Sequence, residues 1–311
     1  MRILFWGTPE FAVPSLRALG EEGHEIVGVV TQPDRPAGRG RELRASAVKN
    51  EALGEGFPVL EPESARSDEF LEQIAGLGAE LSIVVAYGQL LSLEALNAPS
   101  QGSLNLHASL LPALRGAAPI NWSIVRGDTV TGVTVMRMVE QMDAGPILFQ
   151  AEEPIAPEET ASDLTMRLSE VGAEALVETL VLLEAGLIEE REQDDSNATY
   201  APKVDRTTAR IDWANGSVAV GNFIRGMDAV PGAWTELEGQ PVKLFRPEAD
   251  PEVIAGAQPG TILKADGDGG LIVATAEGAL RVSEVQPPGK RRMEASAWIL
   301  GRGAMAGQRF E

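Results

Sequence analysis

Two polar side chains stand two residues apart in the segment Ser103–His107, which reads SLNLH. Because alternate residues of an extended strand project to the same side, Asn105 and His107 are predicted to share one face, with Leu104 and Leu106 packed on the other. Burying an amide beside an imidazole is costly unless both groups are hydrogen-bonded or used in chemistry. Proteins with alternating strands and helices place their ligands at the carboxyl ends of the strands, where this pair stands. We therefore interpret Asn105 and His107 as functional residues rather than as core residues.

A carboxylate follows the next predicted strand. Asp143 lies in the loop 140–145, and an aspartate before a small residue and a glycine is most often a turn former, so its assignment depends on pairing with Asn105 and His107. Together the three groups suit direct acyl transfer to an amine. The imidazole and the amide can stabilise an oxyanion, and Asp143 can hold the charge state of the imidazole and help to move a proton from the amine to the leaving nitrogen.

Composition excludes several other chemistries. The chain has no cysteine, which removes disulfides, thiolate nucleophiles and cysteine zinc sites. With only His24 and His107, a poly-histidine metal site fails as well, and we expect no metal. The turn Gly7-Thr8-Pro9 after the first predicted strand lacks the G-x-G-x-x-G spacing, so we set a dehydrogenase interpretation aside.

The charge is large and uneven. The formal net charge of -20 argues against a general polyanion binder, so any contact with nucleic acid must be local. Residues 205–311 carry 12 basic and 14 acidic residues, whereas residues 1–204 carry 14 and 32. The sequence has no apolar run that approaches 18 residues and no basic leader with a cleavage site, so we expect a cytoplasmic protein without a membrane partner.

The elements that position the candidate residues follow a βαβ rhythm. The predicted strands are Ile3–Trp6, Ile26–Thr31, Leu81–Val85, Ser103–His107 and Gly132–Val139. The predicted helices are Val13–Leu19, Ser67–Gly76, Ile120–Gly127 and Ala161–Ala185, and a long loop follows Thr31. This order predicts an α/β fold with a doubly wound, mostly parallel sheet whose ligands bind beyond the carboxyl ends of the strands.

A change of composition marks a second domain. The polar segment Glu189–Thr199 is typical of a linker or an exposed connection. From Ala209 onward, short strands alternate with turns rich in glycine and proline, as in small barrels; these strands are Val242–Phe245, Gly260–Leu263, Leu271–Thr275 and Leu280–Val285. We predict domains at 1–188 and 209–311, joined by a linker at 189–208.

The candidate strand belongs to a longer motif, Asn105-Leu106-His107-Ala108-Ser109-Leu110-Leu111-Pro112, with Asp143 downstream and Arg115-Gly116-Ala117-Ala118-Pro119-Ile120 between them. On these motifs the chain resembles the methionyl-tRNA formyltransferases, a branch of the 10-formyltetrahydrofolate-dependent transformylases, over essentially its whole length. The resemblance implies that Asn105, His107 and Asp143 are catalytic. It also implies a Rossmann-like catalytic domain, 10-formyltetrahydrofolate as formyl donor, and a folate site lined by Ser109, Leu110, Leu111 and Pro112.

A basic loop inside the acidic domain indicates what kind of molecule receives the formyl group. Five basic residues stand against two acidic ones, Asp34 and Glu42; the basic residues are Arg35, Arg39, Arg41, Arg44 and Lys49. A charge run is usually solvated surface, but in this setting we interpret it as a phosphate-binding loop. The resemblance implies that the loop enters the acceptor arm of tRNA, with Arg35, Arg39 and Arg41 as contacts. Glu42 departs from the lysine-rich continuation common in the family.

The carboxyl-terminal part matches the family through Ala209–Trp213 and Pro288–Met293. Family members have a small barrel resembling an OB-fold here, which holds tRNA. The resemblance therefore implies an OB-like β-barrel domain with tRNA contacts at Lys290, Arg291 and Arg292. The implied partners are initiator methionyl-tRNA and the folate donor, and we expect a monomer.

The implied reaction transfers formyl to the amino group of methionine esterified to initiator tRNA, for translation initiation. Two other functions remain open from the sequence. A transformylase acting on a small amine, such as glycinamide ribonucleotide or an amino sugar nucleotide, would not need the basic loop or the second domain. A noncatalytic RNA-binding protein would have no reason to keep Asn105, His107 and Asp143 together.

Overall fold

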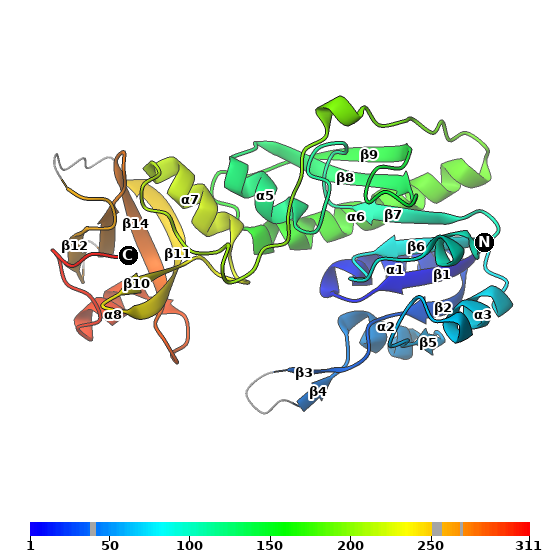
Figure 1. The fold of residues 1–311 in the computed structure, drawn as a ribbon, viewed down its shortest axis with the longest axis horizontal. Coiled ribbons are helices and arrows are strands. Elements are labelled where there is room, and N and C mark those ends of the chain that lie inside the picture. Colours follow the sequence, from blue (N-terminus) through cyan, green and yellow to red (C-terminus); the bar gives the residue numbers. More distant parts are fainter. Residues whose placement is uncertain (38–41, 251–256, 268–269) are drawn as a thin grey trace. The chain divides into compact units, whose positions relative to one another are not determined.

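The computed structural model describes residues 1–37, 42–250, 257–267 and 270–311. The chain forms two compact units (Figure 1). The N-terminal unit comprises Met1–Gly116, Val130–Pro154 and Thr165–Tyr200. The C-terminal unit comprises Ala117–Thr129, Ile155–Leu164 and Ala201–Glu311.

A seven-stranded sheet forms the centre of the N-terminal unit, in the order β5-β2-β1-β6-β7-β8-β9. Its strands are β1 (Arg2–Gly7), β2 (Glu25–Val30), β5 (Val59–Leu60), β6 (Leu81–Val85), β7 (Ser103–His107), β8 (Val130–Arg137) and β9 (Ile147–Pro154). The first five run parallel, β8 pairs antiparallel with β7, and β9 pairs antiparallel with β8, so the predicted doubly wound, mostly parallel sheet is confirmed. The strand order reverses between β1 and β6, where folds of this class bind ligands.

Helices flank this sheet, so its inner strands are buried along most of their length. All five residues of β6 are buried. The helices are α1 (Val13–Glu21), α2 (Ala47–Glu55), α3 (Asp68–Gly76), α4 (Leu93–Asn97) and α6 (Ala161–Glu184) (Figure 1). The backbone of α6 comes so close to β7 that a Cβ atom on Gly172 would lie 2.6 Å from the side chain of Leu106.

Aromatic packing anchors the core on the side of β1 and β6. The indole of Trp6 makes edge contacts with Phe70 at 5.8 Å and with Tyr87 at 5.2 Å between ring centroids. Its Nε1 atom donates to the hydroxyl of Ser82 at 3.0 Å, so the one polar atom of this buried ring is satisfied.

The long loop predicted after β2 contains regular structure, which corrects that prediction. Strand β3 (Arg35–Ala37) pairs antiparallel with β4 (Glu42–Arg44), and α2 follows with Ser46 as its cap, whose hydroxyl accepts from the backbone of Lys49. The signals were weak because strands of three residues carry little periodicity. Two predicted tRNA contacts, Arg39 and Arg41, lie outside the described residues.

An antiparallel sheet forms the C-terminal unit, in the order β10-β11-β14-β13-β12 with β15 paired to β14. Its strands are β10 (Trp234–Leu237), β11 (Gln240–Asp250), β12 (Ile262–Asp266), β13 (Gly270–Ala274), β14 (Ala279–Gln286) and β15 (Met293–Glu294). The final residues join its two edges, because Phe310 bridges to Leu237 of β10 and Arg309 bridges to Thr261 beside β12. The predicted small barrel domain is thus confirmed as a curled sheet closed by the end of the chain.

The helices of the C-terminal unit include α5 (Pro119–Arg126), α7 (Ser217–Gly226) and α8 (Ala295–Leu300). Helices α5 and α7 are in close contact at Gly226, where a Cβ atom would lie 2.5 Å from Val125. The carbonyl of Gly226 also accepts from the Asn121 amide at 2.7 Å. In the core of this unit, Trp213 stacks on Phe310 with 5.8 Å between ring centroids, which ties the end of the chain to the core.

Candidate active site

Strand β7 holds Asn105 and His107 at the carboxyl edge of the sheet, between parallel β6 and antiparallel β8. The alternation predicted from the sequence is present. Leu106 packs on α6, whereas His107 contacts residues in the loops that follow β7 and β8. The strand itself therefore sets the direction of both candidate side chains.

The imidazole of His107 is buried, with 6% of the residue exposed, and lies between two oxygen atoms. Its Nε2 atom is 3.0 Å from the backbone carbonyl of Leu114, and its Nδ1 atom is 3.8 Å from Oδ2 of Asp143. Since a carbonyl oxygen only accepts, Nε2 carries the hydrogen in this contact. Nδ1 is then an acceptor in the neutral ring and a donor facing a carboxylate in the charged ring.

Asp143 is held in place by its backbone as well as by its side chain. Its φ of 52° lies in the left-handed region, which is unfavourable for a residue with a Cβ atom and persists only where the surroundings impose it. Its Oδ2 atom accepts from the backbone nitrogen of Gly116 at 2.8 Å. The structure thus brings the predicted pair His107 and Asp143 together, through the loop 140–145 that the sequence marked as a turn.

Asn105 is half-buried on the same strand, two residues or about 6.6 Å before His107. Among the described residues none forms a hydrogen bond with its side-chain amide. An amide without a protein partner beside a paired imidazole can donate to a bound substrate.

The predicted folate loop is tightly built. Ser109 and Leu111 are buried, and the Ser109 hydroxyl donates to the carbonyl of Ala113 at 2.6 Å, so this side chain shapes the loop. Thr134 of β8 fixes the loop from below by donating to the carbonyl of Ser109 at 2.6 Å and accepting from the backbone of Leu111 at 3.1 Å. Leu110 and Pro112 are only partly buried and remain the members of this set with accessible surface.

The connection expected to be an exposed linker contributes directly to the site. Gln193 donates to the carbonyl oxygens of Asp143 and Gly145 and accepts from the buried guanidinium of Arg115. Thr199 also accepts from the backbone of Leu114 at 2.9 Å. Sequence reasoning missed these residues because their partners lie 48 to 85 positions away.

A second group of polar residues lines the sheet edge where the strand order reverses. The Thr8 hydroxyl donates to the carbonyl of Tyr87 at 2.9 Å, and Gln32 contacts the same carbonyl at 3.4 Å. Gln89 and Arg35 both donate to the side-chain oxygen of Gln32. The root of the β3–β4 segment is thereby tied to the ends of β1, β2 and β6, a link that the sequence did not suggest.

Two basic side chains of the predicted basic loop, Lys49 and Arg35, are bound to neighbouring side chains. Lys49 pairs with Asp34 and Glu61 at 2.8 Å each, and its hydrogen bonds with Asp34 and Glu61 raise its pKa. Arg35 is bound to Gln32. Lys49 therefore holds the base of the segment together, and Arg44 is exposed on β4.

The three consecutive cations Lys290, Arg291 and Arg292 have different environments. Arg292 pairs with Asp228 at 2.9 Å and with Glu284, and its guanidinium stacks 4.0 Å above the ring of Phe245. Lys290 and Arg291 are exposed. The structure therefore separates Arg292, which braces the unit internally, from its two neighbours.

Lys290 lines a pocket of about 330 Å³ around Trp234. The charged residues of its lining are Arg206, Lys243 and Lys290, and none is acidic. Arg206 and Arg210 each lie 5.4 Å from the Trp234 ring centroid. A pocket with three cations suits phosphate groups, and no local sequence signal marks it, because Arg206 lies 28 positions before Trp234.

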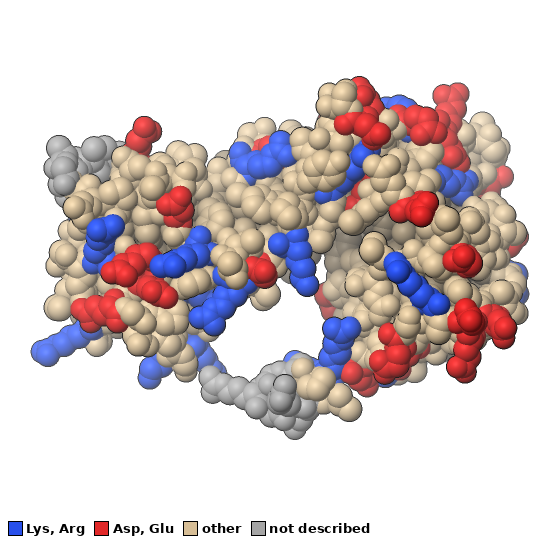
Figure 2. All heavy atoms as spheres, viewed as in Figure 1, with Lys and Arg blue, Asp and Glu red and all other residues tan. Residues whose placement is uncertain are grey.

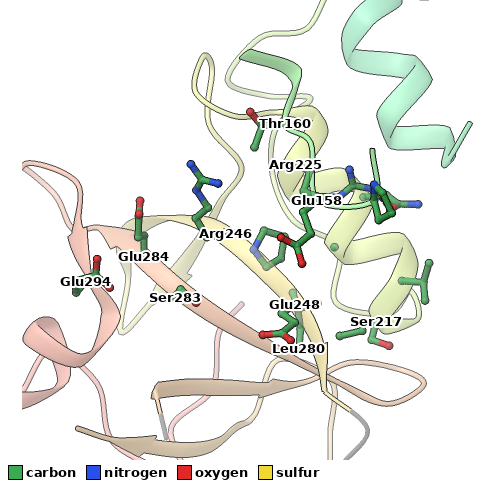
Figure 3. Close-up of a pocket in the computed structure, with 16 residues that line it drawn as sticks. Glu158, Thr160, Ser217, Arg225, Arg246, Glu248, Leu280, Ser283, Glu284 and Glu294 are labelled. Carbon is green, nitrogen blue, oxygen red and sulfur yellow. Dashed lines mark hydrogen bonds between the residues drawn. The ribbon is translucent and has the colours of Figure 1, made fainter. Parts of the chain in front are cut away.

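A larger pocket of about 500 Å³ in the same unit has the opposite character (Figure 3). It lies between α7, β11 and β14, and four carboxylates line it together with Arg225 and Arg246; these are Glu158, Glu248, Glu284 and Glu294. Burial lowers the pKa of Arg225, whose guanidinium donates to the carbonyl of Glu159. The excess of carboxylates disfavours polyanions here.

The two units differ in surface charge, and the N-terminal unit is the more acidic one (Figure 2). On the face drawn in Figure 2, basic and acidic side chains are interspersed over the C-terminal unit, in line with 12 basic and 14 acidic residues in 205–311. Acidic side chains gather along the α3 side of the N-terminal unit (Figure 2). A polyanion therefore meets less repulsion on the C-terminal unit.

In the part of the chain that the structure describes, no three histidine, aspartate or glutamate side chains group as metal ligands do. Within the same residues, no helix combines the length and the apolar character needed to cross a bilayer.

Family models match both units of the chain. The model described as formyl transferase covers residues 1–180, and the formyl transferase C-terminal domain covers residues 203–303. The chain belongs to the formyl transferase family.

Curated relatives narrow the comparison to one branch. A methionyl-tRNA formyltransferase of Symbiobacterium thermophilum is 47% identical over 310 residues, covering 100% of this chain and 95% of the relative. The methionyl-tRNA formyltransferase of Thiobacillus denitrificans is 45% identical over 310 residues, covering 100% and 99%.

Solved structures share the fold at low identity. A sugar 3N-formyl transferase, WlaRD, has a TM-score of 0.68 at 18% identity and covers 94% of this chain and 99% of its own. HypX from Aquifex aeolicus, solved in complex with tetrahydrofolic acid, has a TM-score of 0.66 at 21% identity, covering 97% of this chain and 47% of its own.

Proposed function

We propose that this protein transfers the formyl group of 10-formyltetrahydrofolate to the amino group of methionine esterified to initiator tRNA. The products are N-formylmethionyl-tRNA and tetrahydrofolate. The observation that carries the proposal is the 3.8 Å approach of His107 and Asp143 beside Asn105, in a chain whose full length aligns with relatives named methionyl-tRNA formyltransferase. We expect the enzyme to act as a monomer in the cytoplasm.

The reaction joins the amine nitrogen to the formyl carbon and breaks the bond between that carbon and N10 of the folate. One proton leaves the amine and one reaches the departing nitrogen. In the tetrahedral intermediate the former carbonyl oxygen carries negative charge, so donors aimed at it lower the barrier.

The geometry suggests how the three residues divide this work. Nε2 of His107 is bound to the carbonyl of Leu114, so Nδ1 is the ring atom available to the reacting groups. In the charged ring, Nδ1–H and the amide of Asn105 can both donate to the oxyanion. Asp143 is then the counter-ion of the ring and can accept the proton of the attacking amine.

The folate donor is proposed to bind along the loop Ser109–Pro112, whose backbone is fixed by Thr134. Gln150 of β9 adds a further hydrogen bond to the carbonyl of Leu111 at 3.0 Å. A loop held from two strands presents its remaining backbone groups in fixed positions, which favours binding of a flat polar ring. Partly buried Leu110 and Pro112 supply the apolar contacts.

The tRNA is proposed to contact two basic regions, one in each unit. The first is the segment that carries Arg35, Arg39 and Arg41, and the second is the Trp234 pocket with Lys290 and the exposed Arg291 beside it. Arg292 supports the second region from within, since its guanidinium is already bound to two carboxylates. Residues 1–188 would then act as the catalytic domain and residues 209–311 as the tRNA-binding domain.

A comparison of acceptors tests this assignment against a small-amine transformylase. We expect formylation of initiator methionyl-tRNA to exceed formylation of glycinamide ribonucleotide by at least about 10³-fold in kcat/KM, because only the tRNA engages the basic regions. Equal or higher activity on the small amine would refute the assignment.

A further inference from the structure

Gln193 is the only half-buried residue in the exposed stretch from Arg191 to Asn197, and both ends of its amide are engaged. Its Nε2 atom donates to the carbonyl of Asp143 at 2.9 Å and to the carbonyl of Gly145 at 2.8 Å. Its Oε1 atom accepts from Nε of Arg115 at 3.1 Å and from Nη2 at 2.8 Å.

Chemistry fixes the orientation of this amide. Two carbonyl oxygens can only accept and a guanidinium can only donate, so a reversed amide would lose all four contacts. Arg115 is itself 2% exposed, and its Nη2 atom also donates to Oδ1 of Asp195 at 2.8 Å. Gln193 is therefore locked between a buried cation and a turn of backbone.

That turn is the one that presents Asp143. The backbone of Asp143 has a φ of 52°, and a Cβ atom on Gly145 would lie only 2.0 Å from the carbonyl oxygen of Arg137. A turn with a left-handed residue and so little clearance needs bonds that hold it. The amide nitrogen of Gln193 donates to two carbonyls of this turn, those of Asp143 and Gly145.

The acceptor side of Gln193 reaches the neighbouring loop. Arg115 immediately precedes Gly116, whose backbone nitrogen donates to Oδ2 of Asp143 at 2.8 Å. The same oxygen faces Nδ1 of His107. One side chain thus joins the loop that carries Asp143 to the loop that binds the carboxylate of Asp143.

We propose that Gln193 is a positioning residue for formyl transfer, which sets the placement of the Asp143 carboxylate against His107 through its hydrogen bonds to Asp143, Gly145 and Arg115. The proposal rests on the proposed function, because it assigns Gln193 to the reaction at that centre. Gln193 itself touches no reacting atom.

The variant Gln193→Glu removes the two hydrogen bonds that Gln193 donates and keeps those that it accepts. A glutamate keeps the two bonds from Arg115 but faces the carbonyls of Asp143 and Gly145 with a carboxylate oxygen. We expect kcat to fall about 10- to 100-fold, as displacements of about 1 Å in a catalytic group do, with KM for methionyl-tRNA within about twofold of wild type. Glu192→Gln is the matched control on an exposed neighbour, and it should keep wild-type kcat.

A double-mutant cycle distinguishes positioning from general support of the fold. If Gln193 acts through Asp143, adding Gln193→Glu to Asp143→Asn should cost less than about threefold in the single-turnover rate at excess enzyme. Rates are compared at a temperature where circular dichroism shows each variant folded. Independent losses that multiply, or a Gln193→Glu enzyme with wild-type kcat, would overturn the proposal.

The two proposals fail differently. Wild-type protein that formylates no methionyl-tRNA contradicts the proposed function, whereas active wild type with equally active Gln193→Glu contradicts only the role of Gln193. If Gln193→Glu does not fold, Gln193→Ala gives the same cycle without an introduced charge, and its kcat must also fall for the proposal to stand.

Discussion

The Oδ2 atom of Asp143 lies 2.8 Å from the backbone nitrogen of Gly116 and 3.8 Å from Nδ1 of His107. One carboxylate oxygen therefore both fixes a loop and faces the imidazole. The first contact is a hydrogen bond that an uncharged amide could also accept. The second matters through charge, so the two roles can be separated by substitution.

Asp143→Asn removes the charge and keeps a carbonyl oxygen that can accept from Gly116. We expect kcat to fall by about 10²- to 10⁴-fold, because proton transfer and the counter-ion of the ring are lost together. KM for methionyl-tRNA should change little. Steady-state rates with charged tRNA measure both values, and Glu140→Gln, a charge removal in the same loop, should leave them unchanged.

His107→Gln keeps a group that can donate to the carbonyl of Leu114 but removes the titratable ring. The oxyanion then loses a donor, and we expect kcat to fall by at least about 10²-fold. His24→Gln, which removes the other histidine, serves as the matched control. An active His107→Gln enzyme with wild-type kcat would remove His107 from the mechanism.

Cations of the Trp234 pocket should act on affinity and not on the chemical step. We expect Lys290→Ala and Arg206→Ala to weaken binding of tRNA and each to reduce the slope of log affinity against log salt by about 1, as loss of one phosphate contact does. Filter binding at several salt concentrations provides the slope. Lys264→Ala, which removes a cation of β12 near Asp266, is the control and should leave the slope unchanged.

Much of this architecture could be predicted from the sequence, because its strands are short segments rich in apolar residues that alternate with helical segments. The predicted strands Leu81–Val85 and Ser103–His107 have the bounds of β6 and β7. Strand β9 was missed because Glu152 and Glu153 interrupt its apolar pattern near the edge of the sheet. Helix α7 was missed because its glycines lower helix propensity.

The site was predictable where its signal is local and not where it depends on long-range contacts. The spacing of Asn105 and His107 indicated a shared face, and the fold preserves it. Gln193 carries no such signal, since its partners lie 48 and 50 positions earlier. Arg292 resembled its exposed neighbours in sequence, and only the fold brings it to Asp228, 64 positions away.

Tyr87 provides a test of the core at high pH. Its hydroxyl is buried without a hydrogen-bond partner among the described residues, and burial raises its pKa to about 12. An unfolded tyrosine loses its proton near pH 10, so between about pH 10 and 12 deprotonation stabilises the unfolded chain and the free energy of unfolding falls as pH rises.

Tyr87→Phe should remove both the buried hydroxyl that has no partner and the loss of stability at high pH. We expect the free energy of unfolding to rise by about 1 kcal/mol at pH 7.5, because an unsatisfied buried hydroxyl is lost. The difference from wild type should widen by about 1.4 kcal/mol at pH 11. Urea denaturation at both values measures it, and Tyr200→Phe, at an exposed position, should show no such widening.

The central claim is formyl transfer to the aminoacyl end of initiator tRNA. The most direct measurement incubates the purified protein with initiator tRNA charged with methionine and with 10-formyltetrahydrofolate, and follows the blocked amino group of the ester. We predict N-formylmethionyl-tRNA and an equal amount of tetrahydrofolate. Folded protein that consumes no formyl donor, or that consumes it while the methionine ester stays unblocked, would contradict the claim.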